Sequence, residues 1–221
     1  MKTLALAFLF FPAFTQGQLS ILVVDGDLIV DHQGLDLKYF PLGEFKPLDW
    51  QVGAAYYPDG NSKSFDGIRF NLPEERAEVN ANGNILALLP GVVTGVSMGE
   101  SNQINHIFIN VPQEKPVFME LLSPGTADLL VYRKIDAEEK PDIEGSVNTF
   151  VFERKVKEVK YVEFLYVWHR SKIKLLKPNK KFILTIMDDH ATEVENFMKE
   201  NKTRLKNPRE VMSLFNFYNQ L

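Results

Sequence analysis

Residues 68–89 read IRFNLPEERAEVNANGNILALL, and the fold class can be inferred from this stretch. Apolar and polar side chains alternate in residues 68–72 and again in 77–79, which is the period of a strand with one buried face. Residues 80–84 form a turn-rich segment, and the apolar run 85–89 follows directly. The stretch predicts three consecutive strands with short connections, which is typical of an antiparallel sheet.

The same pattern extends over most of the chain. Turn residues separate the runs every 8–15 residues, and no long helical period intervenes, so βαβ units are excluded. The one expected break is a helical turn at residues 117–122. The other expected strands lie at residues 21–24, 28–30, 52–57, 92–98, 104–111, 129–132, 147–156 and 161–168.

From residue 179 onward the apolar period changes to that of helices. Asn207 followed by a proline and, three residues on, by Glu210 is typical of a helix start. The apolar face of these helices consists of Val194, Phe197, Met198, Val211, Leu214, Phe215 and Tyr218. We therefore predict an α+β fold: an antiparallel β sandwich or curved sheet over residues 18–178, followed by two or three helices over 179–221.

The first residues predict export. Met1 and Lys2 precede an apolar run of 11 residues at 4–14, and residues 15–17 (Thr-Gln-Gly) are a small-residue cleavage site. This is the organisation of a signal peptide over residues 1–17, and the run is too short for a membrane span, which needs about 20 residues. We expect a periplasmic or extracellular protein without a transmembrane span.

Composition excludes several classes of function. The chain has no Cys, so disulfides, thiolate nucleophiles and Cys metal sites are absent. Removal of residues 1–17 leaves 24 basic against 29 acidic residues, a net charge of −5. This charge argues against nucleic-acid binding.

Residues 95–99, GVSMG, match the G-x-S-x-G pattern of a serine hydrolase, with Ser97 as nucleophile. Asp128 or Asp142 with His169 would be available as partners. However, the flanking residues favour a hairpin with strands at 92–98 and 104–111. A hydrolase elbow needs a parallel sheet, so this is the weaker interpretation.

Asp188, Asp189 and His190 could in principle bind a metal. Consecutive residues at a helix start point about 100° apart, so we expect an aspartate to cap the helix instead. His32, His106 and His169 are isolated in the sequence. We predict no metal, no cofactor and no catalytic residue.

The segment 153–181 is the one strongly basic part of the chain. It predicts either a surface for an anionic envelope component or protein partner, or a solvated edge strand protected by lysines. The candidate surface residues are Arg154, Lys157, Lys160, Arg170, Lys172, Lys174 and Lys177.

Three segments carry a resemblance: YYPDGNSKSFDGIRFNLPEERAEV at 56–79, FMELLSPGTADLLVYRK at 118–134 and FMKENKTRLKNPREVMSLFNFYNQL at 197–221. They resemble a family of uncharacterised exported Bacteroidota proteins over most of residues 50–221. Phe70 stands where that family usually has Tyr. The resemblance implies export, a β-rich body and a C-terminal helix pair, and it implies no mechanism.

The expected function is that of an exported, non-enzymatic accessory or binding protein acting through a surface. Two weaker interpretations are a serine hydrolase using Ser97 and a lipid-carrying curved sheet with a helical lid.

Overall fold

The computed structural model describes residues 20–24, 27–31, 37, 49–100, 103–141 and 155–221. The predicted signal peptide, residues 1–17, and most of the strand expected at 147–156 lie outside the described residues. Strands β1 (Ser20–Val24) and β2 (Asp27–Asp31) pair antiparallel, as expected for the apolar runs at 21–24 and 28–30.

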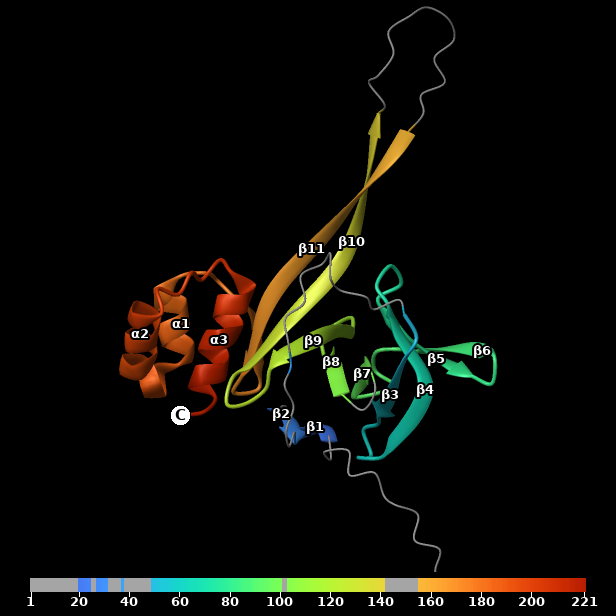
Figure 1. Ribbon diagram of the computed structural model, residues 1–221, viewed down its shortest axis with the longest axis horizontal. Helices are drawn as coiled ribbons and strands as arrows, with labels where there is room; N and C mark the ends of the chain where they lie inside the picture. The colour runs from blue at the N-terminus through green and yellow to red at the C-terminus, as the bar shows by residue number, and fades with distance from the viewer. Residues whose placement is uncertain (1–19, 25–26, 32–36, 38–48, 101–102, 142–154) are drawn as a thin grey trace, which may run out of the picture.

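The main body is one open antiparallel sheet of ten strands, in the spatial order β12-β11-β10-β9-β8-β7-β3-β4-β5-β6 (Figure 1). The antiparallel β-rich architecture is thus confirmed, whereas a sandwich of two sheets is not. The strands are β3 (Gln51–Tyr56), β4 (Ser62–Asn71), β5 (Arg76–Ala81), β6 (Asn84–Leu88), β7 (Gly95–Glu100), β8 (Gln103–Val111), β9 (Val117–Ser123), β10 (Asp128–Pro141), β11 (Lys155–His169) and β12 (Lys172–Leu175).

The turn between β5 and β6 follows from its sequence. Asn82 and Gly83 both have positive φ angles, 54° and 87°, and connect the paired residues Ala81 and Asn84. Two positive φ angles in a two-residue loop match the twist of a hairpin, and Asn-Gly is the preferred pair there. The Asn80 side chain accepts a hydrogen bond from the Gly83 N–H at 2.8 Å, which fixes the turn.

The helical turn expected at residues 117–122 is wrong, because these residues form strand β9. Residues 118–123 are all buried, so the strand shows no alternation between a buried and an exposed face. A short run of this kind has no period that separates a buried strand from a buried helix.

The sheet curls strongly over its middle strands. Phe70 on β4 and Phe108 on β8 are three strand steps apart in the sheet order, which would be about 14 Å in a flat sheet. Their rings are nevertheless stacked with centroids 4.1 Å apart, and the Phe118 ring on β9 meets Phe70 edge-on at 6.0 Å. The curl therefore folds one face of the sheet inward and places β4 over β8 and β9.

Local irregularities accompany this curl. The register shifts in the β3–β4, β7–β8 and β9–β10 pairings, and such bulges increase the twist of a sheet. Gly53 on β3 lies at one of them. A Cβ at this position would lie 2.1 Å from the Ser97 carbonyl oxygen and 2.5 Å from the Ile68 side chain, so only glycine fits there.

Two hydrophobic cores result. The inner core fills the curl and consists of Ala55, Ile68, Phe70, Leu72, Ala77, Val79, Val93, Val96, Met98, Phe108 and Phe118. The second core joins β8–β11 to three helices, α1 (Lys180–Ile186), α2 (Ala191–Glu200) and α3 (Pro208–Tyr218). A short 3-10 turn, η1 (Asp188–His190), links α1 to α2. None of the helices in the described ranges has the length and apolar run that crossing a bilayer requires.

The predicted buried face of helix α3 and its predicted cap at Asn207 are both confirmed. Val211, Leu214, Phe215 and Tyr218 are buried, and the Asn207 side chain caps the helix by accepting from the Arg209 N–H at 3.1 Å. At the other end, Asn219 accepts from the Ala127 N–H at 3.0 Å and donates to Ser123 Oγ at 3.1 Å. These bonds attach the end of α3 to the connection between β9 and β10.

We predict that Phe70→Ala lowers the free energy of unfolding by about 3–5 kcal/mol, because it removes the ring that joins β4 to β8 and leaves a cavity in the inner core. Urea denaturation measures the change. Phe65→Ala on the same strand is the control, since Phe65 is only half-buried and should lose less than half as much. Equal losses for the two variants would contradict the central position of Phe70.

Candidate functional site

Ser97 of the GVSMG motif lies in the middle of strand β7, between Ala54 of β3 and Ile107 of β8. The side chain is buried, and its Oγ forms a hydrogen bond with the Tyr56 hydroxyl at 3.0 Å. His106 is paired with Met98, the next residue along β7, so it projects from the opposite face of the sheet. The motif thus lacks the strand–turn–helix elbow that its hydrolase interpretation requires.

The residues considered as partners of Ser97 are engaged elsewhere. Asp128 accepts a hydrogen bond from the Gly125 N–H at 3.0 Å, in the connection that leads into β10. His169 Nδ1 lies 2.8 Å from the Thr126 carbonyl oxygen, at the end of β11. Asp142 and the isolated His32 lie outside the described residues.

Four charged or polar side chains meet on the inner face of the sheet, one from each of β8, β9, β10 and β11. His106 Nδ1 lies 2.6 Å from Glu120 Oε1, and Arg133 Nη1 forms an ion pair with Glu120 Oε2. Arg133 Nε reaches Glu163 Oε1 at 2.7 Å. We call His106, Glu120, Arg133 and Glu163 the inner charge cluster; it links four neighbouring strands across the sheet.

Burial determines the protonation state of His106. The side chains of His106, Glu120 and Arg133 are at most 7% exposed. Burial, followed by the nearby Arg133 guanidinium, lowers the pKa of His106 to about 4, so its imidazole is neutral at pH 7. A neutral imidazole donates a hydrogen bond from Nδ1 to Glu120, whose charge Arg133 balances.

An imidazole paired with a carboxylate is the chemistry of a general base. Here both partners are closed off from solvent and held by an arginine, so the arrangement serves to join strands. The sequence pattern did not predict the cluster, because residues 117–122 were expected to form a helical turn. The available signal was Glu120 itself, a single charge inside the apolar run VFMELL.

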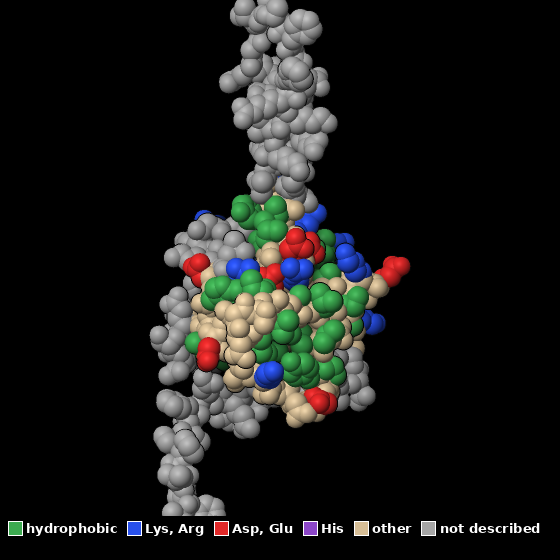
Figure 2. Space-filling view, turned by 90° about the vertical axis from the view of Figure 1, so that its right-hand side faces the viewer, with side chains coloured by type: hydrophobic (Ala, Val, Ile, Leu, Met, Phe, Trp, Pro, Cys, Tyr) green, Lys and Arg blue, Asp and Glu red, His purple; other side chains and the backbone are tan. Residues whose placement is uncertain are grey.

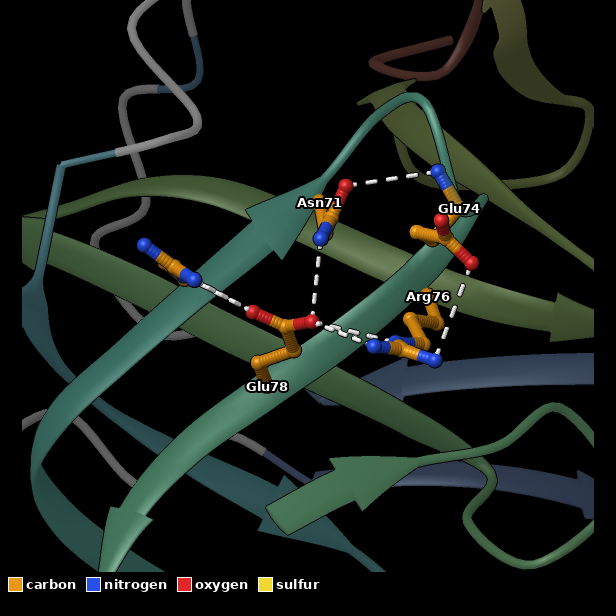
Figure 3. Close-up of polar contacts among 5 residues, drawn as sticks. Asn71, Glu74, Arg76 and Glu78 are labelled. Atoms are coloured by element: carbon orange, nitrogen blue, oxygen red, sulfur yellow. Dashed lines mark hydrogen bonds and ion pairs between the residues drawn. The ribbon is translucent and has the colours of Figure 1, made fainter. Parts of the chain in front are cut away.

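A second buried carboxylate, Glu78 on β5, lies between two arginines (Figure 3). Its Oε2 accepts from Arg69 Nε at 2.8 Å, and its Oε1 accepts from Arg76 Nη2 and Asn71 Nδ2 at 2.9 Å each. Burial by itself raises the pKa of Glu78, but the bonds from Asn71, Arg69 and Arg76 outweigh it and hold the pKa below its usual range.

The Arg69 guanidinium also stacks on the ring of Trp50, 4.3 Å from the ring centroid. Two arginines share one buried carboxylate here, and Glu74 lies 3.8 Å from Arg76 at the exposed side. Through these bonds Glu78 joins β5 to β4.

The expected cap by Asp188 or Asp189 is wrong. The cap position of α2 is His190, which makes no side-chain capping bond. Asp188 pairs with Arg170 at 3.0 Å, and Asp189 accepts from the Tyr218 hydroxyl at 2.9 Å. The aspartates therefore connect η1 to the β11–β12 turn and to α3. Within the described ranges, no group of three or more His, Asp or Glu residues is placed to hold a metal ion.

The basic residues of the predicted anion surface that lie in the described ranges do not form one patch. Arg154 lies outside the described residues. Lys157 and His169 are twelve residues apart on the same strand β11, which is about 40 Å, so Lys157 is remote from β12. Lys172 and Lys174 on β12, and Lys177 after it, are exposed together at one edge of the sheet.

Two of the candidate lysines on β11 stand in register with acidic residues of β10. Lys160 pairs with Asp136, and Lys157 pairs with Glu139. Arg170 is engaged by Asp188. Of the candidate residues that the structure describes, Lys157, Lys160 and Arg170 therefore each have an acidic residue opposite or bonded to them, whereas Lys172, Lys174 and Lys177 are exposed together at the β12 edge.

Comparison of the chain with family models, curated proteins and solved structures finds no match.

We predict that the free energy of unfolding falls as the pH is lowered from 6.5 to about 4. Between these pH values His106 is protonated in the unfolded chain but stays neutral in the folded protein. This difference lowers the free energy of unfolding by about 3 kcal/mol. His106→Asn keeps a donor for Glu120 but does not titrate, so its profile should be flatter. Identical slopes for wild type and His106→Asn would refute the assignment.

Glu78→Gln should destabilise the fold by about 2–3 kcal/mol, because Arg69 then loses its carboxylate partner and Arg76 keeps only the exposed Glu74. Thermal and urea unfolding report the loss. Glu74→Gln removes an exposed partner of the same Arg76 and should cost less than about 0.5 kcal/mol. If the two variants have the same free energy of unfolding, the buried Glu78 carboxylate does not stabilise the pairing of β4 with β5.

Proposed function

We propose that the protein is an exported, non-enzymatic binding protein that engages a protein partner through the projecting part of the β10–β11 hairpin. The observation that carries this proposal is the register of the sheet. Strand β9 pairs with β10 only as far as Val131, whereas β10 and β11 remain paired from Tyr132–Phe164 to Pro141–Lys155.

This projecting part, residues 132–141 with 155–164, is called the ribbon below. It extends about 30 Å beyond Val131, the last residue that pairs with a third strand, and Figure 1 shows it leaving the body of the molecule. A two-stranded hairpin by itself is marginally stable in water. Of its described side chains, only Tyr132 and Ile135 pack against a hydrophobic core, so contact with another molecule is the best explanation for the rest of the ribbon.

The side chains at the base of the ribbon support a protein partner. Tyr161 is 55% exposed, and Phe164 is also exposed. Exposed aromatic side chains are enriched where proteins bind proteins. The ribbon also carries residues of both charges, six basic and five acidic. This mixed charge suits a protein surface better than a polyanion.

An anionic envelope component remains the second candidate partner, at a different place. Lys172, Lys174 and Lys177 are exposed at the β12 edge.

The lipid-carrier and hydrolase interpretations have less support. A lipid carrier would need an open concave face, whereas Phe70, Phe108 and Phe118 fill the curl. A hydrolase would need Ser97 accessible, whereas it is buried on a central strand.

The test places a photo-crosslinking amino acid at Tyr161 in the ribbon, and at exposed Lys181 on α1 as the control. In cells that export the protein, we expect position 161 to give a crosslinked product of one defined mass that position 181 does not give. Excess protein that carries Tyr161→Ser and has Asn-Gly in place of residues 137–159 should not compete, although it should melt like the wild type.

Equal crosslinking at both positions, or competition by the shortened protein, would contradict binding through the ribbon. The variant Lys172→Glu, Lys174→Glu, Lys177→Glu separates the two candidates. If this variant loses the crosslinked product at position 161 while the shortened protein still competes, the partner binds at the β12 edge and not at the ribbon.

A further inference from the structure

We propose that strand β6 is the contact surface of a homodimer, in which it pairs antiparallel with β6 of a second copy. This interface lies at the opposite end of the sheet from the ribbon and is independent of the proposed function.

The two edges of the sheet differ in how they are protected. The edge strand β12 carries exposed Lys172 and Lys174, and lysines on an edge oppose pairing with another chain. The edge strand β6, at the other end of the strand order, carries none. In fact no acidic or basic residue occurs between Glu78 and Glu100, although 24% of the chain is charged.

This uncharged edge is also apolar on its surface. Ile85 is 56% exposed, Leu86 53%, Leu89 51% and Val92 56%. Ile85 and Leu86 are consecutive in a strand, so they present apolar side chains on both faces of the sheet. Figure 2, which looks onto this side of the molecule, shows hydrophobic side chains gathered in the middle with most charged side chains around them.

The absence of charged residues along β6 indicates that this edge binds a second copy of the chain. In a two-fold antiparallel pair, each residue faces a residue of the same strand, so a charge near the centre would face its own like charge. Pairing all five residues of β6 places Leu86 opposite Leu86 of the partner and Ile85 opposite Ala87 of the partner. Two copies of a chain with net charge −4 repel each other, and this edge lets them approach without like-charge contacts.

The dimer can be tested on the purified protein by light scattering coupled to size exclusion. We expect the wild type to have twice the mass of one chain, and Leu86→Lys to have the mass of one chain. Because Leu86 is exposed, Leu86→Lys should keep the wild-type circular dichroism spectrum. Leu175→Lys, at a similarly exposed leucine on the β12 edge, is the matched control and should remain dimeric.

A chain without Cys allows a second test of the register. Directly opposed Cα atoms in an antiparallel pair are about 4.5–5.5 Å apart, within the range of a disulfide. Leu86→Cys should therefore form a disulfide-linked dimer on mild oxidation, whereas Ala87→Cys and Leu175→Cys should not.

A wild type that is monomeric at about 100 μM, or a Leu86→Lys protein that stays dimeric, would overturn the proposal. Equal crosslinking of Leu86→Cys and Leu175→Cys would do the same.

Discussion

The stacking of Phe70 on Phe108 is the central contact of the structure, because it holds a wide sheet in a curl. A ten-stranded sheet has two faces to cover, and the described part of this chain has only three short α-helices. The curl covers one face with the sheet itself, and the helices cover part of the other beside β9 and β10. Gly53 and the register shifts permit the bend, and the rings of Phe70, Phe108 and Phe118 fill its inside.

The buried charges are a consequence of the same curl. Glu120, Arg133 and His106 lie on the face that turns inward, and each is satisfied by a partner on an adjacent strand. Glu78 is held in the same manner between Arg69 and Arg76. Buried ions of this kind stabilise a fold only when every partner is in place, so they favour one strand register over others.

The two ends of the sheet have contrasting surfaces. At one end, β10 and β11 continue beyond the third strand and present aromatic and mixed charged residues, and β12 protects the edge with lysines. At the other end, β6 is uncharged and apolar. The two proposed contacts, the ribbon and β6, lie at opposite ends of the sheet, so they would not compete with each other.

Local features of this protein could be predicted from the sequence: the strands with alternating patterns, the Asn82–Gly83 turn, the Asn207 cap and the buried face of α3. Each depends on residues a few positions apart. Strand β9 could not be predicted, because a strand buried on both faces has no period, and neither could the Asp189–Tyr218 bond, which joins distant residues. The curl, the inner charge cluster and the register of β11 lysines against β10 acids arise in the tertiary structure alone, because strand order and register place those residues together.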